Sequence, residues 1–292
     1  MRVRRWMCAV AMVASNSALG WALPAGSPAQ LVREVVYNEM HDHERHGYWR
    51  YWIVQQAERE IRVSEQVETA DGPVVRLVAE GGQPLPGAAV QHENERLRLL
   101  LGSAQEQARH RQEYAEDERR IGRIVELLPD AFLYEYVDEE GGCYRLRFRP
   151  NPVYPARGVE ARIFHAMQGE LWVDARQKRL VRLSGELDEN VDFGYGLLGR
   201  LYKGGWFRLD RRQVSATDWK TERLEIHMSG RALLFKTIAQ ETRETRGGFA
   251  AVPAGLTLAQ GVALLEEQSA RSIVALVPPL GAIRASAFAS KR

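Results

Sequence analysis

The sequence predicts an α+β fold that is mainly antiparallel β, with one large curved sheet covered by helices. Two observations lead to this prediction. Between residues 144 and 245, short segments rich in β-branched and aromatic residues alternate with Gly, Asp and Asn, as in a series of hairpins. Between residues 88 and 128 the chain is instead highly charged and has helical spacing. Because one face of so long a sheet is apolar, the sheet must curl around something or be covered.

The start of the chain predicts a secretory signal peptide over residues 1–22. A basic beginning is followed by a nine-residue apolar run, Trp6–Ala14, and then by small residues that suit cleavage after Gly20 or Ala22. The run is far shorter than the roughly 20 apolar residues of a spanning helix. We therefore expect a cleaved leader, a periplasmic or secreted protein, and no transmembrane segment once the leader is removed.

The composition of the mature chain is that of an ordinary globular protein. Hydrophobic residues make up 45% and charged residues 27% of the sequence. Without the three leader arginines, 37 basic residues face 38 acidic ones, and a net charge of about −1 favours no nucleic-acid partner. Cys8 lies in the leader, which leaves Cys143 as a lone structural thiol and predicts no intramolecular disulfide.

The first part of the mature chain predicts a helix followed by a small group of strands. Apolar residues at helical spacing place the helix over Ala29–His41. Three strands come next, and the dipeptide Asp71-Gly72 predicts a hairpin between the last two. These strands are expected at residues 47–57, 60–68 and 73–80.

A helical insert is predicted over residues 88–128, after Gly81-Gly82-Gln83-Pro84 breaks the first strands. Two apolar patches flank Gly102-Ser103, which is the expected bend, and Pro129-Asp130 is expected to stop the helix. Most of the sheet then follows as short strands, at Tyr144–Arg149, Ala161–Gln168, Glu170–Asp174, Arg179–Leu183, Trp206–Leu209, Glu222–Met228 and Ala232–Ile238.

The end of the chain predicts one more helix and then a tail. Thr257 is expected to cap a helix that ends near Ser269. The apolar run at residues 273–277 is too short to cross a membrane, and residues 281–292 are expected to form a flexible tail. Residues 23–280 are therefore expected to form a single domain that carries the helical insert.

The polar motifs favour no catalytic site, no metal site and no cofactor. His41-Asp42-His43-Glu44-Arg45-His46 holds two histidines at helical spacing, but without matching ligands elsewhere a solvated helix end is the better interpretation. The run 113–123 mixes both signs of charge, as on a wet helix surface. Gly194-Tyr195-Gly196 lacks the lysine and helix start of a phosphate loop. We expect no enzyme, and keep His165 and Asp174 as acid–base candidates of a third hypothesis.

The candidate binding site is the apolar face of the sheet. Its residues fall at alternating positions along the strands, so that many can share one face, and a flexible, Met-containing face suits acyl chains. The alternative is a filled core under a helix lid. The candidate lipid-binding residues are Met167, Leu171, Val181, Leu183, Phe207, Leu209, Ile226, Met228 and Phe235.

Three segments of the predicted sheet resemble a known family. They are Phe148–Pro152, Phe164–Asp174 with its pattern Gly-Glu-Leu-Trp-Val-Asp, and Lys178–Leu183. Together they resemble the lipoprotein-carrier family of periplasmic proteins, a group that includes lipoprotein localisation factors and the periplasmic regulator of the envelope-stress sigma factor. The resemblance spans residues 130–245. It implies an unclosed β-barrel with helices across its mouth and a hydrophobic cavity for lipid or lipoprotein acyl chains.

The leading functional hypothesis is a periplasmic binding protein that holds lipid or lipoprotein acyl chains in the concave face of the sheet. The alternative is an envelope sensor or protein-interaction module with a filled core. In that case the charged helical insert is the surface that meets another envelope protein.

Overall fold

The computed structural model describes residues 26–42, 47–57, 60–155, 157–193, 199–232 and 236–269. In these residues thirteen strands form one antiparallel sheet, accompanied by five helices. The strands are β1 (Tyr48–Ala57), β2 (Glu60–Val67), β3 (Val74–Glu80), β4 (Gln83–Pro84), β5 (Phe132–Glu140), β6 (Cys143–Pro150), β7 (Met167–Asp174), β8 (Leu180–Leu187), β9 (Val191–Phe193), β10 (Gly199–Leu201), β11 (Trp206–Gln213), β12 (Trp219–Ala232) and β13 (Lys236–Val252). The helices are α1 (Pro28–Met40), α2 (Gly87–Gly102), α3 (Ala104–Ala131), α4 (Gly158–His165) and α5 (Leu258–Ser269).

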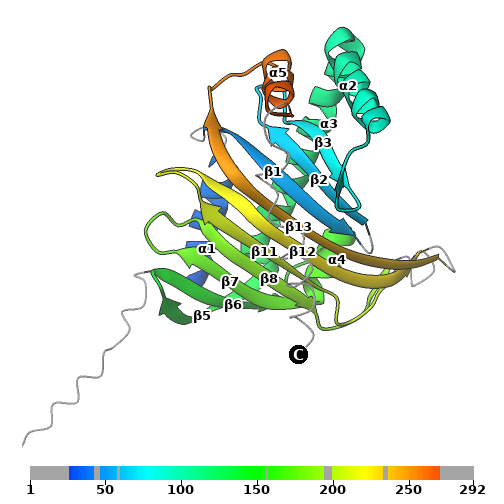
Figure 1. Cartoon of the computed structure of the whole chain (residues 1–292). Helices are drawn as coiled ribbons and strands as arrows, with labels where there is room; N and C mark the ends of the chain where they lie inside the picture. The colour runs from blue at the N-terminus through cyan, green and yellow to red at the C-terminus, as the bar shows by residue number, and fades with distance from the viewer. Residues whose placement is uncertain are drawn as a thin grey trace, which may run out of the picture.

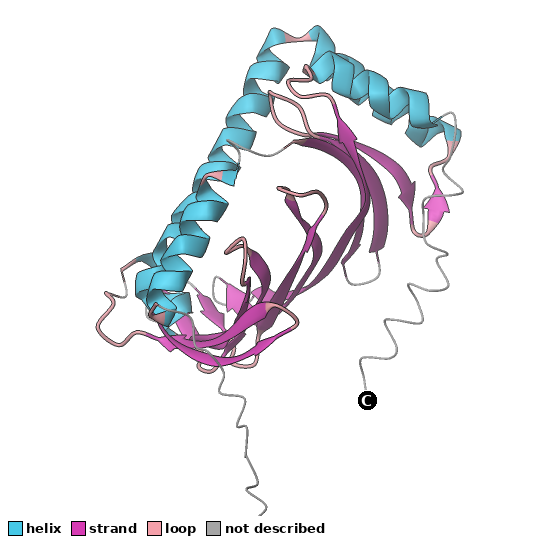
Figure 2. Cartoon of the chain, turned by 90° about the vertical axis from the view of Figure 1, so that its left-hand side faces the viewer, coloured by secondary structure: helices cyan, strands magenta, loops and turns pink. Residues whose placement is uncertain are grey.

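The sheet is open and strongly curved. Its strands lie in the order β4-β3-β2-β1-β13-β12-β11-β8-β7-β6-β5, and β10 pairs with both β12 and β9 beside this path. Figure 2 shows the strong curvature of the sheet, with the long helix running along its concave side. In Figure 1, α2 and α5 lie at the end of the sheet that holds β2 and β3. The predicted fold class, an unclosed antiparallel sheet with helices and a helical insert, is confirmed.

Some of the segments considered in the sequence lie outside the described residues. These are the predicted leader at 1–22, the run at 273–277 and the tail at 281–292. Among the helices described, none has the length and apolarity needed to cross a membrane.

Helix boundaries follow the capping residues of the sequence. Ser27 accepts a hydrogen bond from the Gln30 N–H and begins α1, with proline at the first helical position. The predicted bend at Gly102-Ser103 is confirmed: α2 ends at Gly102, and Ser103 caps α3 by accepting from the Glu106 N–H at 3.2 Å. The side chain of Thr257 accepts from Gln260 N–H at the start of α5, as predicted.

Two predicted boundaries were wrong because tertiary packing overrides local pattern. The segment Ala161–Gln168 was expected to be a strand, but α4 continues to His165 and only Met167 begins β7. Ala161 and Phe164 are three residues apart, so a helix buries both on one face. The proline at 129 was expected to stop the insert, yet α3 runs on to residue 131 with Pro129 buried in its last turn.

Two turns also differ from their predicted form. The first group of strands does not end at glycines 81 and 82. Both glycines have positive φ and make a tight turn from β3 into the short strand β4, which pairs with β3. The predicted strand Ala232–Ile238 is divided between the end of β12 and the beginning of β13, which pair with each other.

The apolar residues gather into two main clusters at opposite ends of the sheet. The first, called the main core, packs α1 and α4 against β5 to β8, and its fully buried members include Leu146, Val173 and Leu187. The second, called the small core, packs α2 and α5 against β2 and β3 around Leu97 and Leu265. Burial of these clusters stabilises the two ends of the sheet, and two smaller buried clusters lie on β1, around Tyr51 and around Val54.

Helix α2 covers the open part of the β3 edge. The backbone N–H of Leu77 donates to Glu93, and the backbone carbonyl of Val75 accepts from Arg96. The two helix side chains are also paired with each other, at 2.7 Å. They take the place of a neighbouring strand and block edge-to-edge pairing at this end of the sheet.

Helix α3 bridges the two ends of the sheet. Its C-terminal part packs on α1 and β5, whereas residues 111–121 are all exposed. In this middle part Tyr114 reaches the β2–β3 turn, where its ring lies beside Gly72, and Arg111 is 3.7 Å from Asp71. A mostly polar helical segment of this kind is typical of a bridge through solvent.

Replacing Leu146 by alanine is expected to lower the free energy of unfolding by about 2–5 kcal/mol, because the cavity left in the main core cannot fully collapse. Leu99→Ala is the matched control: Leu99 is exposed on α2, and its loss should change the stability by less than about 0.5 kcal/mol. Urea unfolding followed by circular dichroism measures both. Equal free energies of unfolding for the two variants would contradict the conclusion that Leu146 packs tightly in the main core.

Candidate functional site

The candidate site is a row of leucines that crosses the concave face from strand to strand. Strand register places them directly opposite one another, so they share one face of the sheet. The row begins at Tyr136 on β5 and ends on β12, where the next residue across is Glu244 on β13. Its leucines are Leu146, Leu171, Leu183, Leu209 and Leu224. We call this the leucine row.

The exposure of the leucine row increases along its length. Leu146 is fully buried and Leu171 is 5% exposed, because both lie in the main core. Leu183, Leu209 and Leu224 are only partly buried. The part of the row on β8, β11 and β12 is therefore an apolar surface that the helices leave incompletely covered.

A second row beside the first contains two glycines that allow aromatic rings to lie flat on the sheet. In register it runs Phe148, Gly169, Gly185, Phe207 and Ile226. A Cβ at Gly169 would lie 1.9 Å from the carbonyl oxygen of Ser184, and one at Gly185 would lie 2.5 Å from the ring of Phe207. Only glycine fits either position, so this part of the face is filled by its own side chains.

The structure divides the predicted lipid-binding residues into groups. Met167 and Leu171 are buried in the main core, and Leu183, Phe207 and Met228 pack partly buried against it. Leu209 and Ile226 lie on the same face farther along, and both are partly buried.

Two of the predicted residues stand apart from these groups. Val181 lies at an irregularity in the β7–β8 pairing, where Trp172 pairs with Arg182 but Val173 pairs with Leu180. Leu180 therefore takes the core-facing position that the alternating pattern had given to Val181. Phe235 lies outside the described residues.

Polar residues on β13, β1 and β2 continue the concave face where the leucine row ends. Glu244 is 8% exposed and accepts from Gln55 Nε2 at 2.8 Å and from Arg246 Nε at 2.5 Å. The guanidinium of Arg246 lies 5.9 Å from the ring centroid of Tyr51, whose hydroxyl accepts from Gln66 Nε2. We call these five residues the polar stripe.

Burial controls the ionisation of the polar stripe. It raises the pKa of Tyr51 well above its usual value, so the phenol stays neutral, and Arg246 only partly offsets this. Burial also disfavours the charged form of Arg246, but the nearby Tyr51 and Glu244 raise its pKa overall. Beside the stripe, Lys220 Nζ lies 2.7 Å from Glu68 Oε1. These four charged side chains therefore form two pairs, each of one positive and one negative group.

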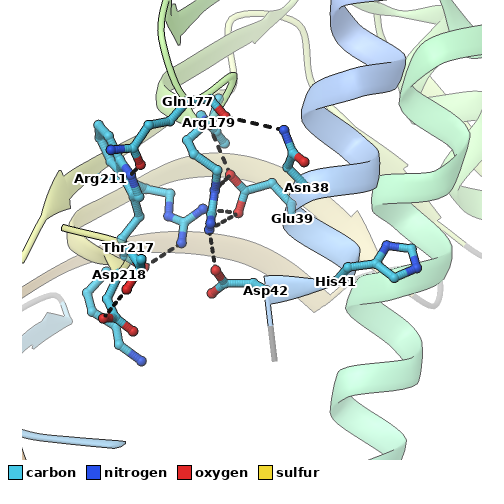
Figure 3. Close-up of polar contacts among 12 residues, drawn as sticks. Asn38, Glu39, His41, Asp42, Gln177, Arg179, Arg211, Thr217 and Asp218 are labelled. Carbon is cyan, nitrogen blue, oxygen red and sulfur yellow. Dashed lines mark hydrogen bonds and ion pairs between the residues drawn. The ribbon is translucent and has the colours of Figure 1, made fainter. Parts of the chain in front are cut away.

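A second polar group fastens α1 to the sheet (Figure 3). Arg179 Nε donates to Glu39 at 3.0 Å and Arg179 Nη2 lies 2.6 Å from Asp42, while Arg211 also donates to Glu39. The side chain of Asn38 donates to the backbone carbonyl oxygens of residues 177 and 178. We call Glu39, Asp42, Arg179 and Arg211 the helix latch.

The helix latch is electrically balanced and largely dry. Its four side chains are between 9% and 19% exposed. Burial alone would raise the pKa of Glu39, but Arg211, Arg179 and the Leu180 N–H hold that pKa below its usual value. Two carboxylates and two guanidiniums satisfy one another, so the group holds α1 in place rather than offering a site for acid–base chemistry.

The other polar candidates from the sequence have local backbone partners. His165 bonds through Nε2 to the Tyr154 carbonyl oxygen, and Asp174 accepts from two backbone N–H groups in the turn after β7. His41 closes α1 by bonding to the carbonyl oxygen of Tyr37, whereas the histidines at 43 and 46 lie outside the described residues. Within the described ranges, no three His, Cys, Asp or Glu side chains are grouped as a metal would need.

Sequence reasoning missed both the polar stripe and the helix latch. Each joins residues more than 130 positions apart, as in the pairs Gln55–Glu244 and Glu39–Arg179. One signal was available: Gln55 is a polar residue that follows Tyr51 and Ile53 at alternating positions, on an otherwise apolar face of the strand.

Comparison with known proteins gives no family for this chain. No protein-family model matches the sequence, and no curated protein matches it significantly. A solved structure of a DUF1329 family protein from Desulfovibrio piger aligns over 86% of this chain and all of its own, with a TM-score of 0.29 and 10% identity. At this score the likeness is distant, and we draw nothing about this chain from it.

Glu39→Gln is expected to destabilise the protein by about 3 kcal/mol, because it leaves buried guanidinium charge uncompensated. The exposed Glu34→Gln, also on α1, is the matched control and should be near neutral. Since the pKa of Glu39 lies below its usual 4.5, its contribution is present above that pH and is lost as the pH falls through the folded value. Thermal unfolding between pH 7 and pH 3 should therefore show the melting temperatures of the wild-type protein and the Glu39→Gln variant converging in acid. A difference that stays constant with pH would contradict this.

Proposed function

We propose that this protein is a periplasmic binding protein that holds lipid or lipoprotein acyl chains on its concave face. The observation that supports this best is the change in exposure along the leucine row. The apolar surface of β8, β11 and β12 continues that of the main core, yet the helices leave it only partly covered. A contiguous apolar surface that the helices cover incompletely is typical of a site for an apolar ligand.

The energetics of such binding are favourable without any reactive group. Each methylene that leaves water contributes about 0.8 kcal/mol, so a chain that covers the exposed half of the row suffices for stable association. The resemblance of residues 130–245 to lipoprotein carriers and the expected signal peptide support the same proposal. Under it the protein is no enzyme and uses no cofactor.

The bridging helix α3 supports a second candidate function, an interaction module of the cell envelope. Its middle is exposed on all sides and carries two large apolar side chains on one face, Tyr114 and Ile121, seven residues apart. Its charges have both signs, so they favour neither an acidic nor a basic partner. We rank this function second because those two side chains do not form a continuous apolar surface.

Native mass spectrometry on mature protein, purified from the periplasm without detergent, tests the proposed function. We expect a bound lipid or acylated species in stoichiometric amount. An unliganded mass that stays unchanged after addition of phospholipid would refute lipid binding and direct attention to the surface of α3.

Ile226→Gln is expected to weaken acyl-chain binding at least about tenfold, since it removes an apolar side chain from the open part of the concave face. His227→Gln is the matched control because the neighbouring residue points to the opposite, solvent-exposed face of β12. Titration with a fluorescent fatty acid measures both affinities. Equal affinities would place the binding surface elsewhere.

A further inference from the structure

The polar stripe lies where an acyl chain on the leucine row would end. Leu224 on β12 pairs directly with Glu244 on β13, which in turn pairs with Gln55 on β1. The face therefore changes from apolar to polar between two neighbouring strands, about 4.8 Å apart. A ligand that covers both parts must itself be amphipathic, with its polar head over β13 and β1.

The charge of this region is balanced at short range. Glu244 is paired with Arg246, and Glu68 with Lys220, and all four side chains are at most 30% exposed. In such surroundings an added charge without a partner costs much more than it does in water. An anionic head would bring one negative charge to a region whose positive charges are already neutralised.

A zwitterionic head fits the same groups without leaving charge unpaired. Arg246 donates its Nε–H to Glu244, and its guanidinium has further N–H groups that can donate to the phosphate of the head group. The ammonium of the head group can lie beside the Glu244 carboxylate. Gln55 is the exposed member of the stripe, and its amide both donates and accepts.

We propose that the polar stripe selects the head group of the bound lipid and favours zwitterionic phospholipids over anionic ones. This inference depends on the proposed acyl-chain binding, which it extends by naming the class of ligand. The acyl chains supply affinity, and the paired charges of Glu244 and Arg246 on β13, with the neutral Gln55 on β1, supply the discrimination between heads.

Competition between two lipids with identical chains tests the proposal. The mature protein is mixed with equal amounts of dioleoyl phosphatidylethanolamine and dioleoyl phosphatidylglycerol, and native mass spectrometry gives the ratio of the two complexes. We expect the ethanolamine lipid to predominate at least fivefold. Glu244→Gln leaves the positive charge of Arg246 without its partner and should reverse the preference.

Two further variants provide an independent test and a matched control. Gln55→Lys adds a positive charge at an exposed position, so it should fold normally and shift the ratio towards the glycerol lipid. Glu241→Gln changes the same formal charge as Glu244→Gln, on the opposite and exposed face of β13, and should leave the ratio unchanged.

The possible outcomes separate the two proposals. Binding of both lipids in equal amounts, unaltered by Glu244→Gln and Gln55→Lys, would overturn head-group selection and leave acyl-chain binding intact. Binding of neither lipid by the wild-type protein would overturn acyl-chain binding, and head-group selection with it.

Discussion

The sheet is wider than the helices that cover it, and this mismatch governs the rest of the structure. Helices α1 and α4 bury the concave face from β5 to β8, whereas α2 and α5 bury a separate patch on the opposite face of β2 and β3. The strands between these ends must manage their inward faces in another way. On β8, β11 and β12 that face stays apolar and partly exposed, and on β13 and β1 it carries Glu244 and Gln55 next to the buried Ile53. The candidate site is the direct result of this incomplete cover.

Both faces of the sheet carry matched charges. On the face opposite the leucine row, Arg182 and Arg208 pair with Asp210, and Arg243 pairs with Glu225. On the concave side, the charged side chains of the helix latch and the polar stripe are mostly buried and closely matched. Removing one partner of such a pair leaves an uncompensated buried charge and is strongly destabilising. Matched pairs are therefore suited to fixing geometry and to discriminating between ligands.

The sequence predicted the architecture better than it predicted the site. Alternating strands, the capping serine at 103 and the charged insert each act locally, so the antiparallel sheet and the paired helices α2 and α3 could be foreseen. The position of α4 could not, because Ala161 and Phe164 fit either a strand or a helix until the main core selects the helix.

The composition of the site depends on contacts that no local pattern reports. Because the pairing between β7 and β8 is irregular, Leu180 rather than Val181 faces the main core. Alternation along the strand alone would predict Val181 at that position. The pairing of β1 with β13 brings Gln55 beside Glu244 across 189 positions of the chain. Strand order, rather than residue type, decides where the apolar surface stops.

The exposed middle of α3 makes this helix a spacer of defined length. Its 28 residues correspond to a rod of about 42 Å, at about 1.5 Å per residue. Removing one residue from the middle would turn the two ends by about 100° relative to each other, so that Gly122 would no longer face Met40 of α1. Removing four, close to one full turn, would nearly keep both faces and shorten the rod by about 6 Å. Homologous proteins can therefore vary the composition of this stretch freely, but can vary its length only in steps of about one helical turn.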